Sequence, residues 1–230
     1  MPGPRAHEKR ERILAAAMRR FAEVGYEAAR VEDMAAELRI AKGSVFQHFG
    51  SKEGLFLAAY QRAVESLPRY QDAPAVVRAK GFFATLRYWL ERSEHLIHED
   101  YIPWRLTLIG NYGSDLALRL EINRYLAGQD AYGTMAFVRE GLARGELRRD
   151  VEPELVASVL EWTMERFQDA LLAEELFPGF FRRALDPARP RRRIEEFVRV
   201  LKDAIGAPGA GKGRVLGDKG GRDLRRSARN

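Results

Sequence analysis

The sequence of 230 residues contains no cysteine and no long apolar run. Without cysteine, the chain forms neither disulfides nor thiolate metal sites. A membrane-spanning helix needs about 20 consecutive, mostly apolar residues, and the sequence offers neither such a run nor a signal-like start. We therefore expect a cytoplasmic protein that does not interact with a membrane.

Basic charge is in excess overall but is nearly balanced before the last 25 residues. The formal net charge is +6. Residues 206–230 hold seven Lys and Arg residues against two Asp residues, which leaves +1 for everything before them. The global charge is therefore a poor indicator of nucleic-acid binding, and only a local concentration of basic residues is informative.

Signals for strands and for catalysis are missing as well. From Pro74 onward the sequence shows neither strand-like alternation nor an Asn-Gly turn. No nucleophile elbow or pair of carboxylates stands out. The glycine-rich stretch 206–221 superficially resembles a phosphate loop, but no buried strand precedes it and no helix follows. We expect an all-α protein that is not an enzyme, needs no cofactor and ends in a disordered basic tail over residues 206–230.

Amphipathic periodicity, by contrast, predicts helices along most of the chain. Pro68 ends a longer helix and opens a linker through Pro74. Pro103 lies inside an otherwise helical stretch, and with the following Gly110 and Gly113 it predicts a kink and a loop. The expected helices span residues 7–24, 31–38, 42–49, 51–67, 75–92, 95–109, 115–144, 153–176 and 190–205.

Residues 38–52 combine three basic side chains and a histidine with two turns and no acid. Val45 and Phe49, four apart, face inward on the short helix 42–49, which leaves Phe46, Gln47 and His48 for its other face. Two short helices joined by a tight turn match a helix-turn-helix, whose second helix offers its N-terminal residues to the major groove. Ser51 is expected to cap the next helix, whose free N–H groups can hold a phosphate.

Several spaced elements over residues 9–56 resemble the DNA-binding domain of the TetR/AcrR family of bacterial transcriptional regulators. The matching elements are residues 13–16 with Phe21 and Gly25, residues 34–35, residues 42–46 with Phe49, and residues 51–55. The resemblance implies a three-helix DNA-binding domain over residues 1–50, a connecting helix and linker over 51–73, and a helical bundle over 74–205 for ligand binding and dimerisation. The expected DNA-binding residues are Arg39, Lys42, Gly43, Ser44, Phe46, Gln47, His48 and Lys52.

The sequence departs from the family pattern in three places. Ala29 and Arg30 replace the usual Thr pair, so helix 31–38 lacks a hydroxyl N-cap, for which its first acids partly compensate through the helix dipole. Arg39 replaces the usual Gly of the turn, which either avoids positive φ or accepts its strain, and Arg39 is an alternative phosphate contact. Phe46 replaces the usual Tyr and lacks the hydroxyl that such a Tyr offers to the DNA backbone.

Helices 153–176 and 190–205 are the candidates for a dimer interface. The apolar residues of the first spread over more than one face, so it must cover its own core and a second surface. In the family that the chain resembles, two C-terminal helices of each subunit usually form a four-helix interface; the alternative is that both helices belong only to the monomer core. The expected interface residues are Val156, Val159, Leu160, Phe167, Ile194, Phe197, Val198 and Leu201.

Large aromatic residues with polar tips, concentrated in residues 96–137, suit a mostly apolar ligand pocket. Aromatic residues at helical spacing are more often ordinary core, and the existence of a pocket is implied by the resemblance. The expected lining residues are Phe83, Trp89, Tyr101, Trp104, Tyr112, Tyr125, Phe137 and Trp162.

His95 and His98 lie three residues apart, with acids beside them. This spacing can place two imidazoles on one side of a metal. The alternatives are that both are solvated or hydrogen-bonding groups, or that one lines the pocket and tunes it by protonation. We expect no metal site.

Together these features predict a ligand-responsive homodimeric repressor. A homodimer sets two recognition helices about 34–36 Å apart, which matches successive major grooves of a near-palindromic double-stranded DNA operator. A small apolar or amphipathic effector would weaken operator binding, and the operator would weaken effector binding reciprocally. Helix 51–67 is the expected lever. The alternatives are an activator, an effector-independent DNA-binding protein, or an enzyme that uses the aromatic chamber.

Overall fold

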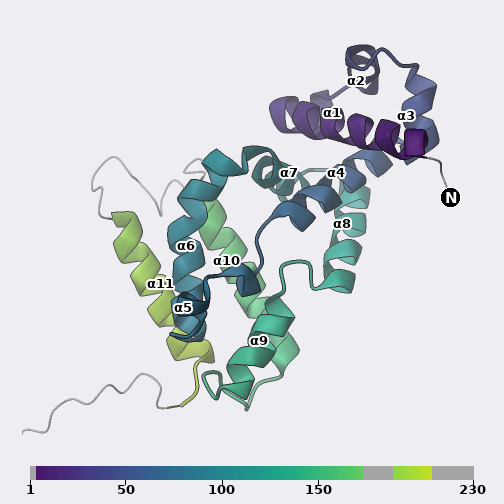
Figure 1. Cartoon of the computed structure of the whole chain (residues 1–230). Helices are drawn as coiled ribbons and strands as arrows, with labels where there is room; N and C mark the ends of the chain where they lie inside the picture. The colour runs from purple at the N-terminus through teal and green to yellow at the C-terminus, as the bar shows by residue number, and fades with distance from the viewer. Residues whose placement is uncertain (1–3, 173–188, 209–230) are drawn as a thin grey trace, which may run out of the picture.

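A computed structural model describes residues 4–172 and 189–208, with side chains placed except at 94–98, 171, 172, 189 and 190. The described chain is helical, and its only β-type pairing is an isolated bridge between Leu147 and Gly206, so the all-α prediction is confirmed (Figure 1). The elements are α1 (Pro4–Ala28), α2 (Val31–Glu37), α3 (Lys42–Phe49), α4 (Lys52–Ser66), a 3₁₀ turn η1 (Tyr70–Asp72), α5 (Ala75–Arg78), α6 (Phe82–Glu99), α7 (Tyr101–Tyr112), α8 (Leu116–Gln129), α9 (Thr134–Ala143), α10 (Pro153–Leu172) and α11 (Arg189–Ile205).

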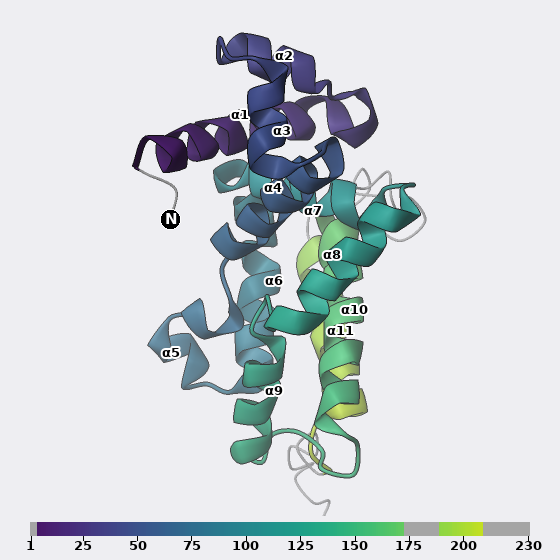
Figure 2. The same cartoon turned by 90° about the vertical axis from the view of Figure 1, so that its right-hand side faces the viewer.

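Buried side chains form two hydrophobic clusters. The first cluster joins α1–α4 with Leu106 of α7 and with Leu118 and Ile122 of α8. The second cluster joins α6, α9, α10 and α11. Each large apolar side chain that is fully buried stabilises the fold by about 1.5–3 kcal/mol. Because α7 and α8 belong to the first cluster, the N-terminal helices rest directly on the C-terminal part of the chain (Figure 2).

Two of the long helices expected from periodicity are each divided. The stretch 75–92 breaks at Gly81, whose φ of +103° ends α5 before α6 begins at Phe82. The stretch 115–144 breaks at Asp130, which adopts a left-handed conformation and whose carboxylate accepts from the backbone N–H groups of Met135 and Ala136. Short breaks of this kind leave the apolar periodicity on both sides intact, which is why periodicity alone missed them.

The kink expected at Pro103 is absent from α7. Pro103 lies in the first turn of that helix, after the N-cap residue Asp100. Backbone N–H groups in the first turn have no acceptor within the helix, so a proline there breaks no hydrogen bond. Gly110 lies inside the helix with its backbone against the ring of Tyr60, and only Gly113 follows the helix as its C-cap. The helix expected over residues 95–109 is interrupted at Asp100 instead, between α6 and α7, so Pro103 follows the break and does not lie inside a kinked helix.

The segment expected to be a tail is ordered at its start. The backbone N–H of Ala207 donates to the carbonyl of Glu146 at 2.9 Å, beside the Leu147–Gly206 bridge. Residues 209–230 lie outside the described residues, as do the side chains of His95 and His98. Among the described helices, none combines the length and apolar character that crossing a bilayer requires. The described side chains also contain no group of three His, Asp or Glu residues placed to hold a metal.

Candidate nucleic-acid interface

The turn between α2 and α3 adopts the strained alternative considered from the sequence. Arg39 has a φ of +55°, and its N–H donates to the carbonyl of Ala36 at 3.0 Å while α2 ends. A non-glycine residue in this region is uncommon but allowed. At the other end of α2, Arg30 is the N-cap residue and makes no side-chain capping bond, so the missing hydroxyl cap is confirmed.

Helix α3 presents one side to solvent, the side that carries its first residues and Gln47. Val45 is fully buried and Phe49 half-buried, as expected from their spacing, whereas Lys42, Gly43 and Gln47 are exposed. The prediction that Phe46 lies on the outer face was wrong, because its half-buried ring packs against the first cluster. The ammonium of Lys42 lies 5.3 Å from the centroid of that ring, which suits a cation–π contact.

The approach of α4 to α3 depends on the Ser51–Gly54 segment. The Ser51 hydroxyl accepts from the Gly54 N–H at 3.1 Å, which confirms the predicted N-cap. A hydrogen bond from Ser51 also lowers the pKa of Glu53. A side chain at position 54 would collide with the carbonyl oxygen of Phe49. Glycine therefore allows the first turn of α4 to lie against the end of α3.

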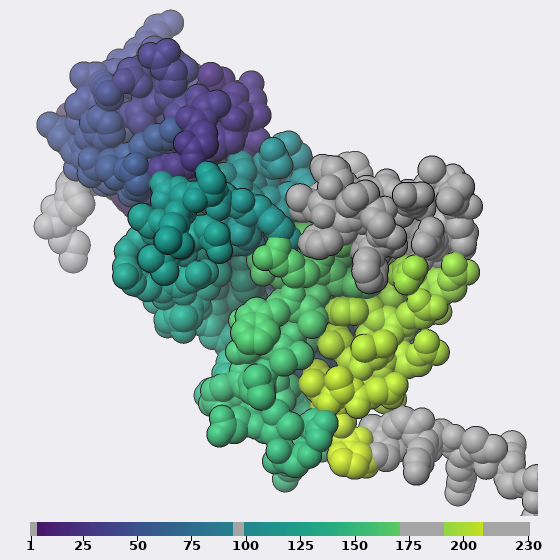
Figure 3. Space-filling view, turned by 180° about the vertical axis from the view of Figure 1, so that it is seen from behind, coloured from purple at the N-terminus to yellow at the C-terminus, as the bar shows by residue number. Residues whose placement is uncertain are grey.

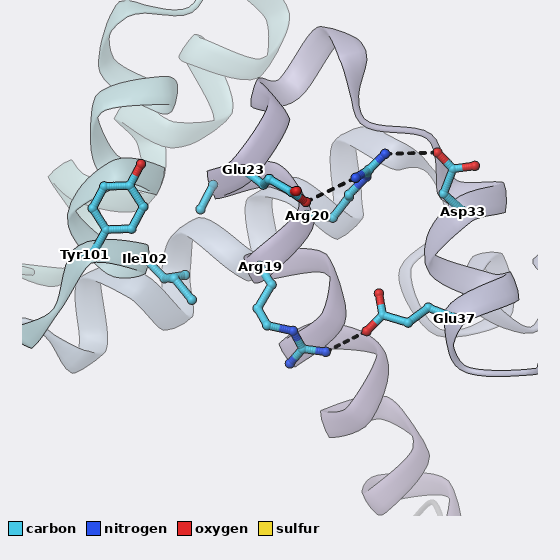
Figure 4. Close-up of a pocket in the computed structure, with 8 residues that line it drawn as sticks. Arg19, Arg20, Glu23, Asp33, Glu37, Tyr101 and Ile102 are labelled. Atoms are coloured by element: carbon cyan, nitrogen blue, oxygen red, sulfur yellow. Dashed lines mark hydrogen bonds and ion pairs between the residues drawn. The ribbon is translucent and has the colours of Figure 1, made fainter.

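Acidic residues of α2 are neutralised by cations of neighbouring helices. The ammonium of Lys42 lies 2.6 Å from a carboxylate oxygen of Glu32, and its hydrogen bond lowers the pKa of Glu32. The other two pairs join α1 to α2 and are drawn in Figure 4: Arg20–Asp33 at 3.3 Å and Arg19–Glu37 at 2.8 Å. Exposed pairs of this kind are individually weak, so a phosphate can replace the carboxylate at small cost.

Two residues of α1 reach the recognition helix and were not anticipated. The Lys9 ammonium donates to the Ser44 hydroxyl at 2.8 Å, and the Arg10 guanidinium lies 4.9 Å from the centroid of the Phe49 ring. The only signal in the sequence was a run of basic residues at the start of α1, and no spacing rule links positions 35 residues apart.

The remaining predicted contacts lie close to this surface. The Lys52 ammonium donates to the carbonyl of Glu27 at 3.1 Å and lies 4.7 Å from the ring centroid of Tyr26. His48 is half-buried, with its ring 6.3 Å from that of Phe49. Lys52 is thus anchored to the end of α1, while its partners are an uncharged carbonyl and a ring rather than an acid.

The residues expected to line one aromatic chamber are distributed over different parts of the molecule. Phe137 is stacked between Tyr70 and Phe82, with ring centroids 4.6 and 4.1 Å away. Phe83 meets Phe82 edge to face, and the buried Trp89 donates to the carbonyl of Tyr70 at 3.5 Å. Phe137 belongs to the second cluster, Phe83 packs against it, and Trp89 is buried, so these residues have the ordinary core role that the sequence left open.

The other five members of that set do not meet each other in a single cavity. Tyr101 lines an open cleft of about 690 Å³ between α1, α2 and α7 (Figure 4), and Tyr112 lines a different cleft of about 470 Å³. Tyr125 packs against the first cluster, and Trp162 is 62% exposed on α10. The indole nitrogen of Trp104 is buried without a partner among the described residues. The expected single chamber is therefore corrected to separate core contacts and clefts.

Carboxylates of α10 face the protein interior. Asp169 is buried and accepts from the Tyr112 hydroxyl at 2.8 Å, while the partly buried Glu165 accepts from the amide of Asn111. Burial raises the pKa of Glu165 to about 7 and that of Asp169 to about 6. Asn111 also accepts from the hydroxyl of Tyr60 at 3.1 Å, so a chain of hydrogen bonds joins α4, α7 and α10.

The expected dimer residues lie mainly inside the subunit. Five of them belong to the buried second cluster, and Phe167 and Phe197 are stacked on each other at 3.9 Å with partial exposure. Val159 is half-buried. Helix α10 has apolar residues on two faces, and their spacing does not say which face points inward. The structure shows that most of the predicted residues lie on the inner face. The five buried residues are Val156, Leu160, Ile194, Val198 and Leu201.

A helix-turn-helix, formed by α2 and α3 and carried on a helical body, defines a class of DNA-binding regulators. Comparison with known proteins identifies the family. Residues 13–59 match the family model described as bacterial regulatory proteins of the tetR family. The chain is 30% identical to the HTH-type transcriptional repressor AcnR of Corynebacterium glutamicum over 72% of this chain and 82% of that protein. The chain therefore belongs to the TetR family, and it is a DNA-binding transcriptional regulator, not an enzyme.

Further relatives extend the similarity beyond the DNA-binding helices. The HTH-type transcriptional repressor DhaR of a Mycobacterium species is 26% identical over 80% of this chain and 86% of that protein. The solved structure of the fatty acid degradation regulator FadR from Bacillus halodurans covers 93% of this chain and all of its own, with a TM-score of 0.60 and 18% identity. At that identity, the structural likeness shows the shared fold alone.

Proposed function

We propose that the protein is a homodimeric repressor that binds a double-stranded DNA operator and releases it in response to a small effector. The observation that carries this proposal is the exposed side of α3 that carries Lys42, Gly43 and Gln47, flanked by the start of α4 and seated on a helical body. The names of AcnR and DhaR support repression rather than activation. The effector is an expectation from the family, whose members usually respond to small molecules.

Within this proposal, the residues of the interface divide the work between base reading and phosphate binding. The exposed Gln47 and the neighbouring His48 are the proposed base contacts, since amide and imidazole groups can bond base edges in the major groove. Gly43 is exposed, and a side chain there would meet no protein atom, so its absence leaves room for the DNA backbone. The proposed phosphate contacts are Arg39, Lys42, Ser44 and Lys52, with Lys9 added because it bonds Ser44.

The proposed dimer interface moves to the outer faces of α10 and α11. Both helices are exposed on the face seen in Figure 3. Leu155 and Trp162 of α10 and Val200 of α11 are 51%, 62% and 60% exposed, and exposed apolar side chains that gather into a patch mark contact sites between proteins. We propose that these three residues, with the half-buried Val159, form the centre of the contact between two subunits.

The domain division predicted from the sequence is retained as part of the proposal. Residues 1–50 would read DNA, residues 51–73 would connect, and residues 74–205 would dimerise and supply most of the effector site. The shared first cluster gives this division a physical consequence. Because α7 and α8 pack on α1 and α4, movement in the C-terminal part reaches the DNA-binding helices through direct contact as well as through α4.

Footprinting on the DNA beside the protein's own gene tests this function. We expect protection of a near-palindromic site by the full chain. The Gln47→Ala variant should lose preference among sites that differ at single base pairs, by about 1–3 kcal/mol per contacted base pair. The Gln129→Ala variant, at an exposed position at the end of α8, is the matched control and should keep that preference. Absence of a protected site, or an equal loss on all sequences for Gln47→Ala, would contradict the assigned role.

A further inference from the structure

A cleft of about 470 Å³ lies where the end of α1 meets α7 and α8. Residues 24–28 form one wall, and residues from Arg105 to Arg119 form the other. We propose that this cleft binds a small amphipathic anion that acts as the effector of the regulator. This inference rests on the proposed function for its regulatory meaning, but the binding site itself is independent of DNA binding.

The walls of this cleft are mostly apolar. Both aromatic hydroxyls are already engaged, because Tyr26 donates to Glu53 at 3.2 Å and Tyr112 donates to Asp169 at 2.8 Å. The two tyrosines therefore contribute ring atoms to the lining rather than hydrogen-bonding groups, and one face of each ring is already covered by a cation: Lys52 lies 4.7 Å from the centroid of Tyr26 and Arg166 4.4 Å from that of Tyr112. The aliphatic lining residues are Val24, Leu108, Ile109 and Leu118. An apolar body of small-molecule size suits these walls and this volume.

Two arginines supply the charge of the cleft. Arg105 is half-buried and Arg119 exposed, and neither guanidinium group makes a hydrogen bond or ion pair within the described part of the chain. Of the two acids in the lining, Asp115 is occupied as the N-cap of α8, accepting from the Leu118 N–H at 3.0 Å. Glu27 is exposed at the rim. Guanidinium groups without a carboxylate partner favour the anionic head of an amphipathic molecule.

The backbone leaves the cleft open on the side of α1. Gly25 has a φ of +82°, which interrupts the regular helix and redirects residues 26–28. A side chain at position 25 would meet no atom within 4 Å. The space beside this kink is thus not filled by the protein's own side chains, so an occupant can enter without displacing the core.

The position of the cleft links an occupant to DNA binding. One wall ends α1 and leads through residues 29–30 directly into α2. The other wall includes Tyr112, which is bonded to Asp169 of α10, and Gly110, which lies against Tyr60 of α4. An occupant that binds one arrangement of these walls more tightly than another shifts the population of subunits toward that arrangement. The difference between the two affinities sets the size of the shift, and the placement of α2 and α3 changes with it.

The test uses 1-anilinonaphthalene-8-sulfonate, an aromatic anion whose fluorescence rises in apolar surroundings, with the full chain in the absence of DNA. We expect saturable binding of one molecule per subunit. The matched neutral probe, N-phenyl-1-naphthylamine, should bind at least tenfold more weakly because it lacks the sulfonate. Raising the salt concentration should weaken binding of the anion and leave the neutral probe unaffected.

Variants locate the probe in the molecule. Arg105→Gln should raise the Kd of the anionic probe about tenfold and Arg119→Gln about threefold, because Arg119 is more exposed. Glu27→Gln should lower the Kd by removing a like charge. Arg124→Gln, which alters an exposed arginine on the same helix outside the cleft, is the control and should change nothing. Leu108→Trp should fill the cleft and abolish binding, with circular dichroism confirming the fold.

The outcomes separate the site from the proposed function. Equal affinity of the probe for the wild-type chain and for Arg105→Gln, Arg119→Gln and Glu27→Gln would overturn the site, even if Leu108→Trp failed to fold. Equal affinity for the two probes would overturn the anionic class. An operator fragment should change the probe's Kd by the same factor as the probe changes the operator's Kd. Probe binding without any operator binding would overturn the proposed function and leave the site intact.

Discussion

Helices α3 and α10 differ in which residues they bury and which they expose. α3 buries Val45 and exposes Lys42 and Gln47, as expected for a surface helix. α10 exposes Trp162 and places the carboxylates of Glu165 and Asp169 toward the interior. Neither arrangement on α10 stabilises an isolated subunit, because apolar area that stays exposed gains nothing from the hydrophobic effect, and buried carboxylates cost free energy when they are charged.

The difference shows which surfaces are complete in a single subunit. The one charged side chain of α3, that of Lys42, lies in solvent and is paired with Glu32, an acid that a DNA phosphate can replace. The outer face of α10 would gain stability by contacting another surface, as in the proposed dimer, whereas the charge on its inner face depends on the protonation of Glu165 and Asp169. The reading surface on α3 is thus complete in one subunit, whereas we predict that α10 responds to dimerisation and to pH.

The largest expected effect concerns the exposed side of α10. Trp162→Ser should weaken the proposed dimer about 100-fold, because a tryptophan that becomes buried at the centre of an interface commonly contributes several kcal/mol to binding. Sedimentation velocity over a range of protein concentrations measures this change. Leu120→Ser, which removes a large exposed apolar residue from α8, is the control and should leave the dimer unchanged. A wild-type chain that stays monomeric at micromolar concentration would remove the contrast between the two helices.

The buried side of α10 predicts an unusual pH dependence. Because burial raises the pKa values of Glu165 and Asp169 to about 7 and about 6, the native state holds protons that the unfolded chain releases from about pH 4 upward. The free energy of unfolding should therefore fall as the pH rises from about 5 to 7.5. Glu165→Gln keeps an acceptor for Asn111 and should stabilise the protein at pH 8 by about 2 kcal/mol, with little change at pH 5.

Urea denaturation at fixed protein concentration, repeated from pH 5 to pH 8.5, measures this effect. A fixed concentration is needed because dimerisation also contributes to apparent stability. Glu195→Gln on the exposed side of α11 is the control and should reproduce the wild-type profile. A Glu165→Gln variant with the same pH slope as the wild type would show that the carboxylate is solvated, and α10 would then resemble α3.

The smallest effect concerns the exposed pair of α3. Lys42→Ala should weaken operator binding about tenfold and reduce the salt slope by about one, because one phosphate contact is lost. Glu32→Gln should instead tighten binding severalfold, since Lys42 no longer has to leave a carboxylate. Fluorescence anisotropy at several salt concentrations measures both. Glu121→Gln, which breaks an exposed pair on α8, is the control. Unchanged affinity in both variants would place Lys42 outside the interface.

The N-terminal helices were the part that the sequence predicted best. The bounds of α3, the Ser51 cap and the missing cap of α2 were all predicted, because each depends on a few adjacent residues and on the periodicity of one helix. Phe46 was placed on the wrong face because position along a helix fixes an angle but not the width of the buried stripe. The contact of Lys9 with Ser44 depends on folding across 35 positions, which no local rule covers.

Amphipathic spacing by itself determined that the chain is all-α and where most helices lie, since helix formation follows from local periodicity and capping. Only the tertiary structure decided which apolar face of α10 is inner, because both faces satisfy the same spacing. It also separated the aromatic residues into core contacts and two clefts, because an aromatic ring suits either environment. Which spaces between the helices are left unfilled by side chains depends on how all the helices pack together, which is a property of the whole fold.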